Sequence, residues 1–384
     1  MKYYIIAGEA SGDLHGSNLI KEIMKLDASA TIRCWGGDKM QEAGGQLVKH
    51  YRELAFMGFA EVLMNLRTIF SNLKFCKEDI LQFKPNALIL IDYPGFNLRI
   101  AKWAKQQGLK VIYYISPQVW AWKENRVKMM KECIDKMLVI LPFEKDYFKN
   151  KWNWDVEYVG HPLVEIIEQF KAQSSESGVT KPGLTTSDLP IGQTGSRLIA
   201  LLPGSRKQEI AKKLPVMLEV SKFFPDHQFI VAEAPSVEDA FYKTFTKPYT
   251  NVSAVKNRTY ELLLQAKAAL VTSGTATLET ALFAVPEVVC YKGSLLSYQI
   301  GKRLVKVKYI SLVNLILDKL VVNELIQNDL TVEKLRKELQ ELLTDEQRIS
   351  AIKNDYALLK KLLGEEGNAS AKAAASIYQY LTSG

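Results

Sequence analysis

The chain has 384 residues, a length that is enough for two large domains. Of these residues 47% are hydrophobic and 24% are charged, a composition that excludes a disordered protein. The formal net charge of +8 favours anionic partners, such as phosphates, nucleic acid or an acidic membrane surface. No apolar run approaches the roughly 18 residues that a membrane span requires. The apolar stretch at residues 3–7 is too short for a secretion signal, so we expect a cytoplasmic protein.

In the first half, short apolar segments alternate with helix-like segments. We predict strands at residues 2–7, 87–92, 109–115 and 137–141, and helices from about residue 12 and at 96–107, 123–132 and 143–150. The strands are apolar on both faces, as in a parallel sheet covered by helices on both sides. Strand and helix in alternation predict βαβ units.

Residues 171–196 break this alternation, because they are rich in Ser, Thr, Gly and Pro and have no apolar period. Beyond this predicted linker we expect strands at 198–202, 227–232, 252–255, 268–272 and 288–291, helices from residue 332, and a last amphipathic helix at 371–381. The predicted fold is α/β, with two doubly wound parallel sheets and a cleft between the two domains. Ligands are expected at the carboxyl ends of the strands.

The first candidate site is the turn after the first strand, AGEASGD at residues 7–13. Gly8 and Gly12 permit a tight turn, and the N–H groups at the helix start could hold an anion or a sugar hydroxyl. The G-x-G-x-x-G spacing is missing, which disfavours a nicotinamide dehydrogenase. The structural alternative is an ordinary turn in which Ser11 or Asp13 caps the helix.

The second candidate is Asp92, which closes an apolar strand just before YPGFN at 93–97. A carboxylate at a strand end could act as a general base on an attacking hydroxyl. The structural alternative is that Asp92 caps a turn or holds a backbone amide. The third candidate is SPQVWAW at 116–122, where Gln118 and two tryptophans could stack on a sugar ring or could plug the core.

The fourth candidate is LPGSR at residues 202–206, which opens the second half. Gly204 turns the chain, and backbone N–H groups converge with the Arg206 guanidinium at a helix start, which would suit a diphosphate. An arginine there opposes the helix dipole, which favours a functional role. In the fifth candidate, SGTATLE at 273–279, Glu279 is expected in the first turn of a helix, where it could bind ribose hydroxyls or only complement the helix dipole.

The sixth feature is a stripe of apolar residues at helical spacing between Phe56 and Leu73, together with a basic segment at 302–308. Such a stripe is usually core. The alternative is contact with acyl chains or with a membrane surface that carries anionic headgroups.

Taken in order with LPFEK at 141–145, Gly160-His161 and YISLVN at 309–314, these motifs resemble the bacterial lipid-A-disaccharide synthase family, from residue 5 to about residue 325. The resemblance implies a GT-B fold. It would have an acceptor- and lipid-binding domain at 1–170 and a UDP-sugar-binding domain at 197–364, joined by the linker at 171–196. Residues 365–384 would pack back onto the first domain.

The resemblance also implies the reaction, in which a diacylated glucosamine passes from UDP to the 6-hydroxyl of 2,3-diacylglucosamine 1-phosphate (lipid X). The product is a β-1,6-linked disaccharide, formed with inversion. By the same resemblance Asp92 matches the proposed base, Arg206 the residue at the diphosphate, and Asn314 a further position important for activity. The positions implied for substrate binding are Gly8, Glu9, Ser11, Gly12, Gln118, Gly204, Ser205, Ser273, Gly274, Thr275 and Glu279. Gly95 and Val313 depart from the family pattern, which often has Asp and Pro there.

No cofactor is implied. The four cysteines and four histidines are dispersed, and no D-x-D-type motif lies beside the predicted diphosphate site, so we predict metal independence. The expected partners are the two lipid-linked substrates and, peripherally, the inner face of the inner membrane of a Gram-negative bacterium, through residues 59–73 and 302–308. No nucleic acid is expected, because an aromatic-basic RNA signature is missing. A homodimer is left open.

Two other functions remain as alternatives. One is another UDP-sugar enzyme of the same architecture, such as an N-acetylglucosamine transferase of wall synthesis or a 2-epimerase. The other is a non-catalytic anion-binding protein, which would rest on the net charge.

Overall fold

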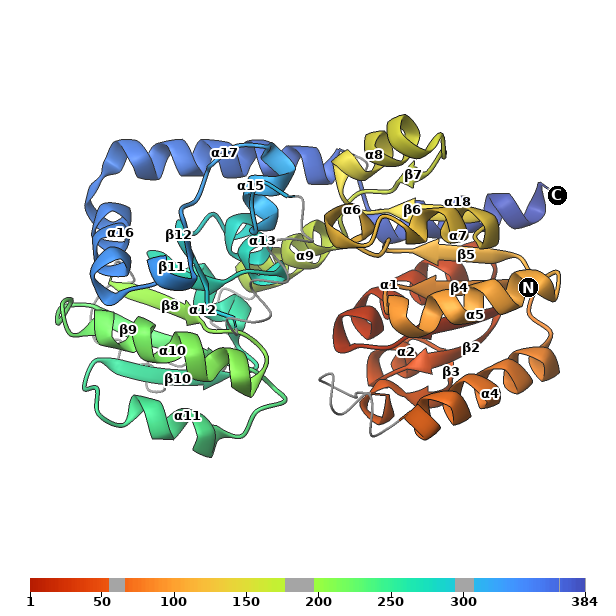
Figure 1. The fold of residues 1–384 in the computed structure, drawn as a ribbon, viewed down its shortest axis with the longest axis horizontal. Helices are drawn as coiled ribbons and strands as arrows, with labels where there is room; N and C mark the ends of the chain where they lie inside the picture. Colours follow the sequence, from red (N-terminus) through yellow and green to blue (C-terminus); the bar gives the residue numbers. More distant parts are fainter. Residues whose placement is uncertain (55–65, 177–196, 294–306, 366, 384) are drawn as a thin grey trace. The chain divides into compact units, whose positions relative to one another are not determined.

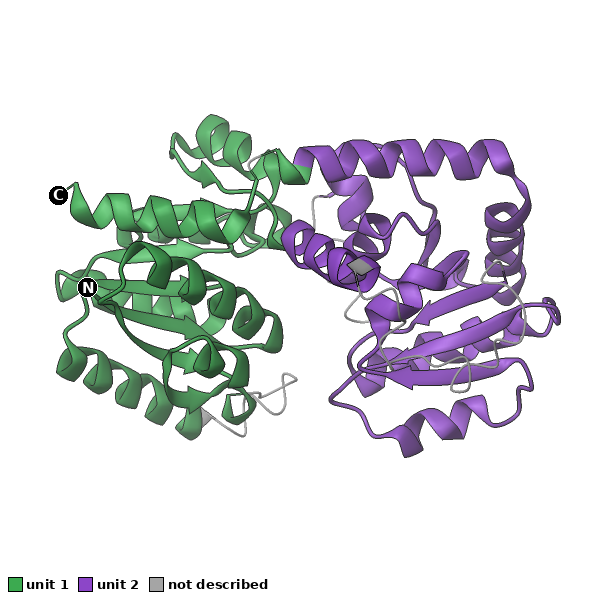
Figure 2. Ribbon diagram, turned by 180° about the vertical axis from the view of Figure 1, so that it is seen from behind, with its two compact units in different colours: residues 1–162, 363–384 green, residues 163–362 purple. Residues whose placement is uncertain are grey.

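The structure is a computed structural model that describes residues 1–54, 66–176, 197–293, 307–365 and 367–383. The chain divides into two compact units, Met1–Pro162 with Leu363–Gly384, and Leu163–Leu362 (Figure 2). Each unit is built around its own parallel sheet, and helices pack against that sheet (Figure 1). None of the described helices is both long enough and apolar enough to cross a bilayer.

The first unit holds a seven-stranded sheet in the order β3-β2-β1-β4-β5-β6-β7, and all of its strand pairs are parallel. Its strands are β1 (Lys2–Ala7), β2 (Thr31–Gly36), β3 (Gln46–His50), β4 (Ala87–Ile91), β5 (Val111–Tyr114), β6 (Lys136–Val139) and β7 (Glu157–Tyr158). Its helices are α1 (Ala10–Leu26), α2 (Asp38–Glu42), η1 (Tyr51–Glu53), α4 (Leu66–Phe83), α5 (Pro94–Gln106), α6 (Val119–Trp122), α7 (Arg126–Cys133), α8 (Pro142–Trp152) and α18 (Ala369–Thr382).

Both faces of this sheet are covered, which explains why its central strands are apolar throughout. On one face, Leu19 and Ile20 of α1 and Ile377 of α18 pack against β1 and β4. On the other face, Ile80 of α4 and Ile100 of α5 belong to a second core cluster. The last helix of the chain therefore packs back on the first unit, as predicted.

The second unit holds a six-stranded parallel sheet in the order β10-β9-β8-β11-β12-β13. Its strands are β8 (Leu198–Leu202), β9 (Gln228–Glu233), β10 (Val252–Lys256), β11 (Ala268–Thr272), β12 (Glu287–Tyr291) and β13 (Glu324–Ile326). Its helices are α9 (Pro162–Glu176), α10 (Lys207–Ser221), α11 (Asp239–Thr246), α12 (Thr259–Gln265), α13 (Thr275–Leu282), α15 (Leu312–Leu317), η2 (Gln327–Asp329), α16 (Val332–Thr344) and α17 (Glu346–Gly364). The predicted class, two doubly wound parallel sheets, is confirmed.

Two local predictions differ from the structure. Helix α9 runs to Glu176, so the first residues of the predicted linker are helical. The hydroxyls of Ser174 and Ser175 donate to carbonyls one turn back within this helix. The rest of that linker lies outside the described residues. The helix predicted at 123–132 is α7, which begins later, at Arg126, and a separate short helix, α6, precedes it.

Candidate functional site

Each sheet reverses its strand order at one point, between β1 and β4 in the first unit and between β8 and β11 in the second (Figure 1). Open α/β sheets bind ligands outside the carboxyl ends of the strands at such a point. The segments that follow these four strands are 8–13, 92–97, 203–206 and 273–279. Four of the predicted motifs therefore lie at the two switch points, two in each unit.

Asp92 follows β4 directly and is half-buried. It has a φ of 43° and Tyr93 a φ of 49°, in the left-handed region that residues other than glycine rarely adopt. The main-chain carbonyl of Asp92 accepts hydrogen bonds from the Asn97 side-chain amide at 2.8 Å and from the Tyr113 hydroxyl at 2.5 Å. The turn is thus held through its main chain, and the Asp92 carboxylate is not one of the groups in these bonds.

The electrostatic surroundings make Asp92 a stronger base than an ordinary aspartate. Burial raises the pKa of Asp92 to about 6, the charge of Glu9 adds to this, and the backbone N–H of Tyr93 acts against it. At neutral pH the carboxylate is therefore deprotonated, yet it binds a proton more readily than a solvated aspartate.

The turn after β1 lies against Tyr93, the residue that follows Asp92. A Cβ atom on Gly8 would lie 2.3 Å from the Tyr93 ring, so a side chain there would displace the ring. Glu9 and Ser11 are exposed at the start of α1, and Gly12, in the first turn of this helix, is buried. The structure thus brings the first two predicted motifs together.

Helix α1 is not capped as the structural alternative assumed. Glu9, at its N-cap, makes no side-chain capping bond. The Asp13 carboxylate instead accepts from the backbone N–H groups of Gly37 at 2.7 Å, Met40 at 3.1 Å and Lys39 at 3.2 Å. Asp13 therefore holds the start of α2, and the cap proposed for α1 is wrong.

The two tryptophans of the motif at 116–122 differ in their surroundings, which bears on whether each could stack on a sugar or fill the core. Trp120 is half-buried, donates its indole N–H to Glu144 at 3.2 Å and packs edge-on against Phe143, so it is held by contacts within the protein. Trp122 is exposed, with the Lys123 ammonium 3.7 Å from its ring centroid, and Gln118 is exposed as well. Trp122 and Gln118 are therefore more accessible to a ligand than Trp120 is.

Glu144 is a residue that sequence reasoning missed. Its buried carboxylate accepts from the Ser116 hydroxyl at 2.7 Å and from the Leu141 N–H at 3.0 Å, besides Trp120. Burial raises the pKa of Glu144 to about 7. Its place in LPFEK was a signal, but the sequence did not show that this carboxylate reaches back to the loop after β5.

In the second unit, the turn after β8 is open. Gly204 has a φ of 120°, which favours glycine, and Ser205 and Arg206 are exposed before α10 begins at Lys207. The Arg206 guanidinium lies 3.6 Å from the Glu209 carboxylate. The turn thus presents a guanidinium and the N–H groups of a helix start at the switch point.

The turn after β11 is equally accessible. Gly274 has a φ of 142°, and Gly274 and Thr275 are exposed. The Ser273 hydroxyl donates to the carbonyl of Ile310 at 2.8 Å, so it is already engaged. Helix α13 begins at Thr275 and has no acidic residue in its first turn, so the expectation for Glu279 is wrong by one turn.

Glu279 is half-buried and accepts a hydrogen bond from the Tyr260 hydroxyl at 3.1 Å. Burial raises the pKa of Glu279 to about 7, although the hydrogen bond from Tyr260 acts to lower this pKa. Close to neutral pH the carboxyl group can therefore both donate to and accept from a ligand hydroxyl.

Asn314 is completely buried, and its amide is fully used. Its side-chain oxygen accepts from the N–H groups of Val321 and Val322, and its side-chain nitrogen donates to the Val322 carbonyl and to Glu324. Glu324, which sequence reasoning missed, also accepts from the N–H groups of Ile310 and Ser311. These contacts favour a role for Asn314 in holding the loop that Ser273 contacts.

In the described part of the chain, no three His, Cys, Asp or Glu side chains come together as they would around a metal ion. Most of the predicted apolar stripe and of the basic segment lies outside the described residues. Ile69, Phe70 and Leu73 are described and belong to α4.

The model of one protein family, described as lipid-A-disaccharide synthetase, matches residues 3–378. The chain belongs to the lipid-A-disaccharide synthase family. Among curated members, it is 37% identical to the enzyme of Geobacter sulfurreducens and 39% identical to that of Geobacter metallireducens. Each alignment covers 94% of this chain and 93% of the relative. Members of this family are glycosyltransferases that form the lipid A disaccharide, and this chain is an enzyme of that class.

Solved structures with the same fold are more distant in sequence. UDP-GlcNAc 2-epimerase from Neisseria meningitidis, bound to UDP-GlcNAc, is 13% identical, with a TM-score of 0.67 over 99% of this chain and 100% of that one. The calicheamicin glycosyltransferase CalG4 is 14% identical, with a TM-score of 0.62 over 100% of this chain and 98% of that one. The glycosyltransferase of kitacinnamycin has a similar TM-score of 0.63. These likenesses support the GT-B fold.

Proposed function

We propose that the chain transfers 2,3-diacylglucosamine from UDP to the 6-hydroxyl of 2,3-diacylglucosamine 1-phosphate, with inversion. Family membership carries this proposal, and the two switch points supply the chemistry. Asp92 takes the proton of the attacking hydroxyl, because a carboxylate with a pKa near 6 is charged at neutral pH and still basic. One base suffices for an in-line attack with inversion.

The leaving group is stabilised in the second unit. The Arg206 guanidinium and the N–H groups of the turn after Gly204 bind the diphosphate of UDP, whose negative charge grows as the sugar departs. Glu279 binds the ribose hydroxyls. Gln118 and the exposed turn around Glu9 and Ser11 contact the acceptor.

The decisive experiment incubates the purified protein with both diacylated substrates, with and without EDTA. We expect disaccharide and UDP in equal amounts, and the same rate with the chelator. Failure to form disaccharide contradicts the proposal, and loss of activity with EDTA contradicts metal independence. A 2-epimerase would convert water-soluble UDP-N-acetylglucosamine, which we expect to remain unchanged.

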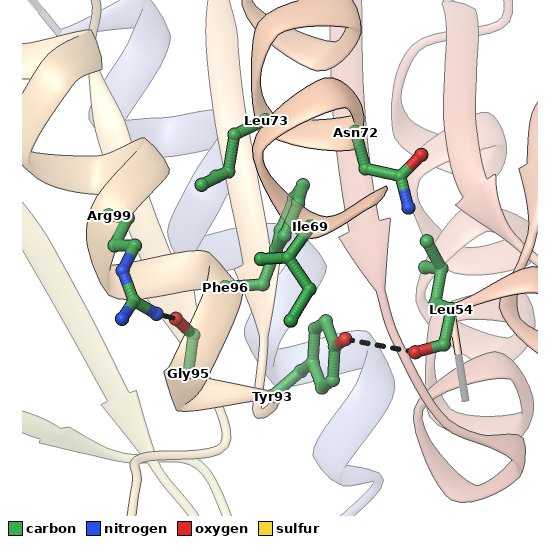
Figure 3. A pocket seen from close by; sticks show the side chains of 8 residues that line it. All are labelled: Leu54, Ile69, Asn72, Leu73, Tyr93, Gly95, Phe96 and Arg99. Carbon is green, nitrogen blue, oxygen red and sulfur yellow. Dashed lines mark hydrogen bonds between the residues drawn. The ribbon is translucent and has the colours of Figure 1, made fainter. Parts of the chain in front are cut away.

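The acyl chains have a suitable surface in the first unit. A pocket of about 210 Å³ lies between α4 and α5, lined by Ile69 and Leu73 and by Tyr93, Gly95 and Phe96 next to Asp92 (Figure 3). In this pocket the Tyr93 hydroxyl donates to the Leu54 carbonyl at 3.4 Å. We assign the pocket to an acyl chain of the acceptor, because its walls are largely apolar and it adjoins the base.

Helix α4 also carries the proposed membrane contact. Phe70 is 65% exposed and Leu81 48% exposed, and Lys74 and Lys77 lie between them at helical spacing on the same face. Apolar side chains beside lysines suit an anionic lipid surface. We expect the protein to float with anionic liposomes at low salt and Phe70→Ser to weaken flotation. Phe223→Ser in the second unit, the control, should not. Equal flotation of both variants would contradict this assignment.

A further inference from the structure

The diphosphate turn of the second unit has a buried cation beneath it. Lys213 is only 3% exposed, although it belongs to α10, whose neighbouring residue Lys212 faces solvent. Helical side chains lean toward the N-terminus of their helix, and Arg206, Glu209 and Lys213 follow one another at spacings of three and four residues. The Lys213 ammonium therefore reaches back along α10 toward the turn that precedes it.

This ammonium lies at the switch point of the second sheet. Its Nζ atom donates to the hydroxyl of Thr272, the last residue of β11. A Cβ atom built on Gly204, just after β8, would lie 3.5 Å from the same nitrogen. Strands β8 and β11 are neighbours, so Lys213 is placed between the carboxyl ends of the two central strands.

The hydrogen-bonding capacity of Lys213 is mostly unused. An ammonium has three donors, and among the described residues only the Thr272 hydroxyl accepts one of them. The Glu209 carboxylate is 3.8 Å away, which is an ion pair without a hydrogen bond. Burial lowers the pKa of Lys213, and the charge of Glu209 acts against this. A buried cation with spare donors is costly unless an anion completes its surroundings.

Glu209 connects this cation to the diphosphate turn. Its carboxylate lies between Arg206, at 3.6 Å, and Lys213, at 3.8 Å. A Cβ atom on Gly204 would lie 2.9 Å from its Oε2 atom, so the carboxylate rests against the turn itself. One anion thus serves two cations, and neither ion pair is close.

We propose that Lys213 is a second cation of the diphosphate site, and that Glu209 is an internal anion which a nucleoside diphosphate displaces. The inference rests on the proposed function, because it deepens the same site. A diphosphate offers several oxygen acceptors to two cations, whereas the single carboxylate reaches each of them only at long distance. Glycine at 204 adds no side chain to the space beside the Lys213 nitrogen.

The test compares Lys213→Met with Lys212→Met, the exposed neighbour. Methionine keeps most of the length of the side chain, and an apolar group in place of a buried charge is often tolerated. We expect Lys213→Met to weaken UDP binding on the order of ten- to a hundredfold in calorimetry. Uridine binding, followed by ligand-observed NMR, and the melting temperature should stay close to wild type. Lys212→Met should bind UDP within about twofold of wild type.

Other outcomes overturn the inference. If Lys213→Met binds UDP as wild type does, Lys213 is not part of the site. If UDP and uridine binding fall together with the melting temperature, its role is only structural. If the wild-type protein does not bind UDP at all, the proposed function itself is contradicted, which distinguishes the two failures.

Glu209→Gln tests the second half of the proposal without disturbing Lys213. It keeps the shape of the side chain and removes the competing charge, so UDP should bind severalfold more tightly, and the gain should be lost in the double variant with Lys213→Met. Weaker UDP binding by Glu209→Gln would show that the carboxylate orients Arg206 instead, and would contradict displacement.

Discussion

Asp92, the proposed base, illustrates how surroundings change the properties of a side chain. Its main chain is held in a left-handed conformation by Asn97 and Tyr113, and its carboxylate is half-buried beside Glu9. Backbone strain of this kind persists only where other groups impose it, and it concentrates at functional positions. Here the strained turn places the Asp92 residue directly after the end of β4.

The variant Asp92→Asn removes the base while keeping its shape. We expect turnover to fall by roughly 10²- to 10⁴-fold, measured as disaccharide formed, because general-base assistance is lost. UDP binding should remain within about twofold of wild type, since the nucleotide site is assigned to the other unit. Asp38→Asn, at an exposed carboxylate of the same unit, is the control. Turnover at the wild-type rate would remove Asp92 from the mechanism.

The pH dependence tests the environment of the same group. Because the carboxylate must be deprotonated and its pKa is raised to about 6, kcat/KM should fall as the pH drops below 6. Glu9→Gln removes a negative charge, which lowers the pKa of Asp92 and should move this acidic limb to lower pH. A limb that stays in place in Glu9→Gln would show that another group titrates.

Residues at strand ends could be predicted from sequence, and residues that reach back to them could not. Asp92 directly follows an apolar strand, and Arg206 follows another after the short turn at 203–205, so their positions were evident. Lys213 and Glu144 stand within helices, where a charged residue usually faces solvent. Only the tertiary fold shows that each points inward, toward a turn far away in the sequence.

The strands show the same division. β1, β8 and β11 coincide with their predicted ranges, because central parallel strands are continuous apolar runs. β2, β3, β7 and β13 were missed. β2 contains Arg33, which pairs with buried Asp79 at 2.6 Å, and β7 and β13 have only two and three residues. Polar or very short strands carry too little apolar pattern to be found in a single sequence.

The loop around Asn314 offers a test of structural importance. Asn314→Ala leaves the N–H groups of Val321 and Val322 without their acceptor in a buried site. We expect a loss of roughly 2–4 kcal/mol in the free energy of unfolding, measured by urea denaturation. The exposed Asn328→Ala is the control and should change stability by less than about 0.5 kcal/mol. An equally small effect of Asn314→Ala would contradict the structural role.

Each unit has its own sheet, its own core and its own switch point, so the two substrates can be assigned to separate parts of the chain. The turn at 203–209, which carries Arg206, and the uncharged turn at 273–277 belong to the second unit, and the carboxylate-bearing turns, around Glu9 and Asp92, belong to the first. A dianionic diphosphate should be repelled by the carboxylates in the turns of the first unit and attracted to the turns of the second unit.

This assignment predicts where UDP protects the backbone. Amide hydrogen exchange with saturating UDP should slow at 203–209 and at 273–277, because the ligand engages N–H groups there and suppresses local opening. Residues 8–13 and 92–97 should exchange at an unchanged rate, since they are assigned to the acceptor substrate and not to UDP. In Arg206→Ala, which we expect to bind UDP more weakly, the protection should require more nucleotide. Protection confined to the first unit would reverse the roles of the two units, and with them the placement of base and leaving group.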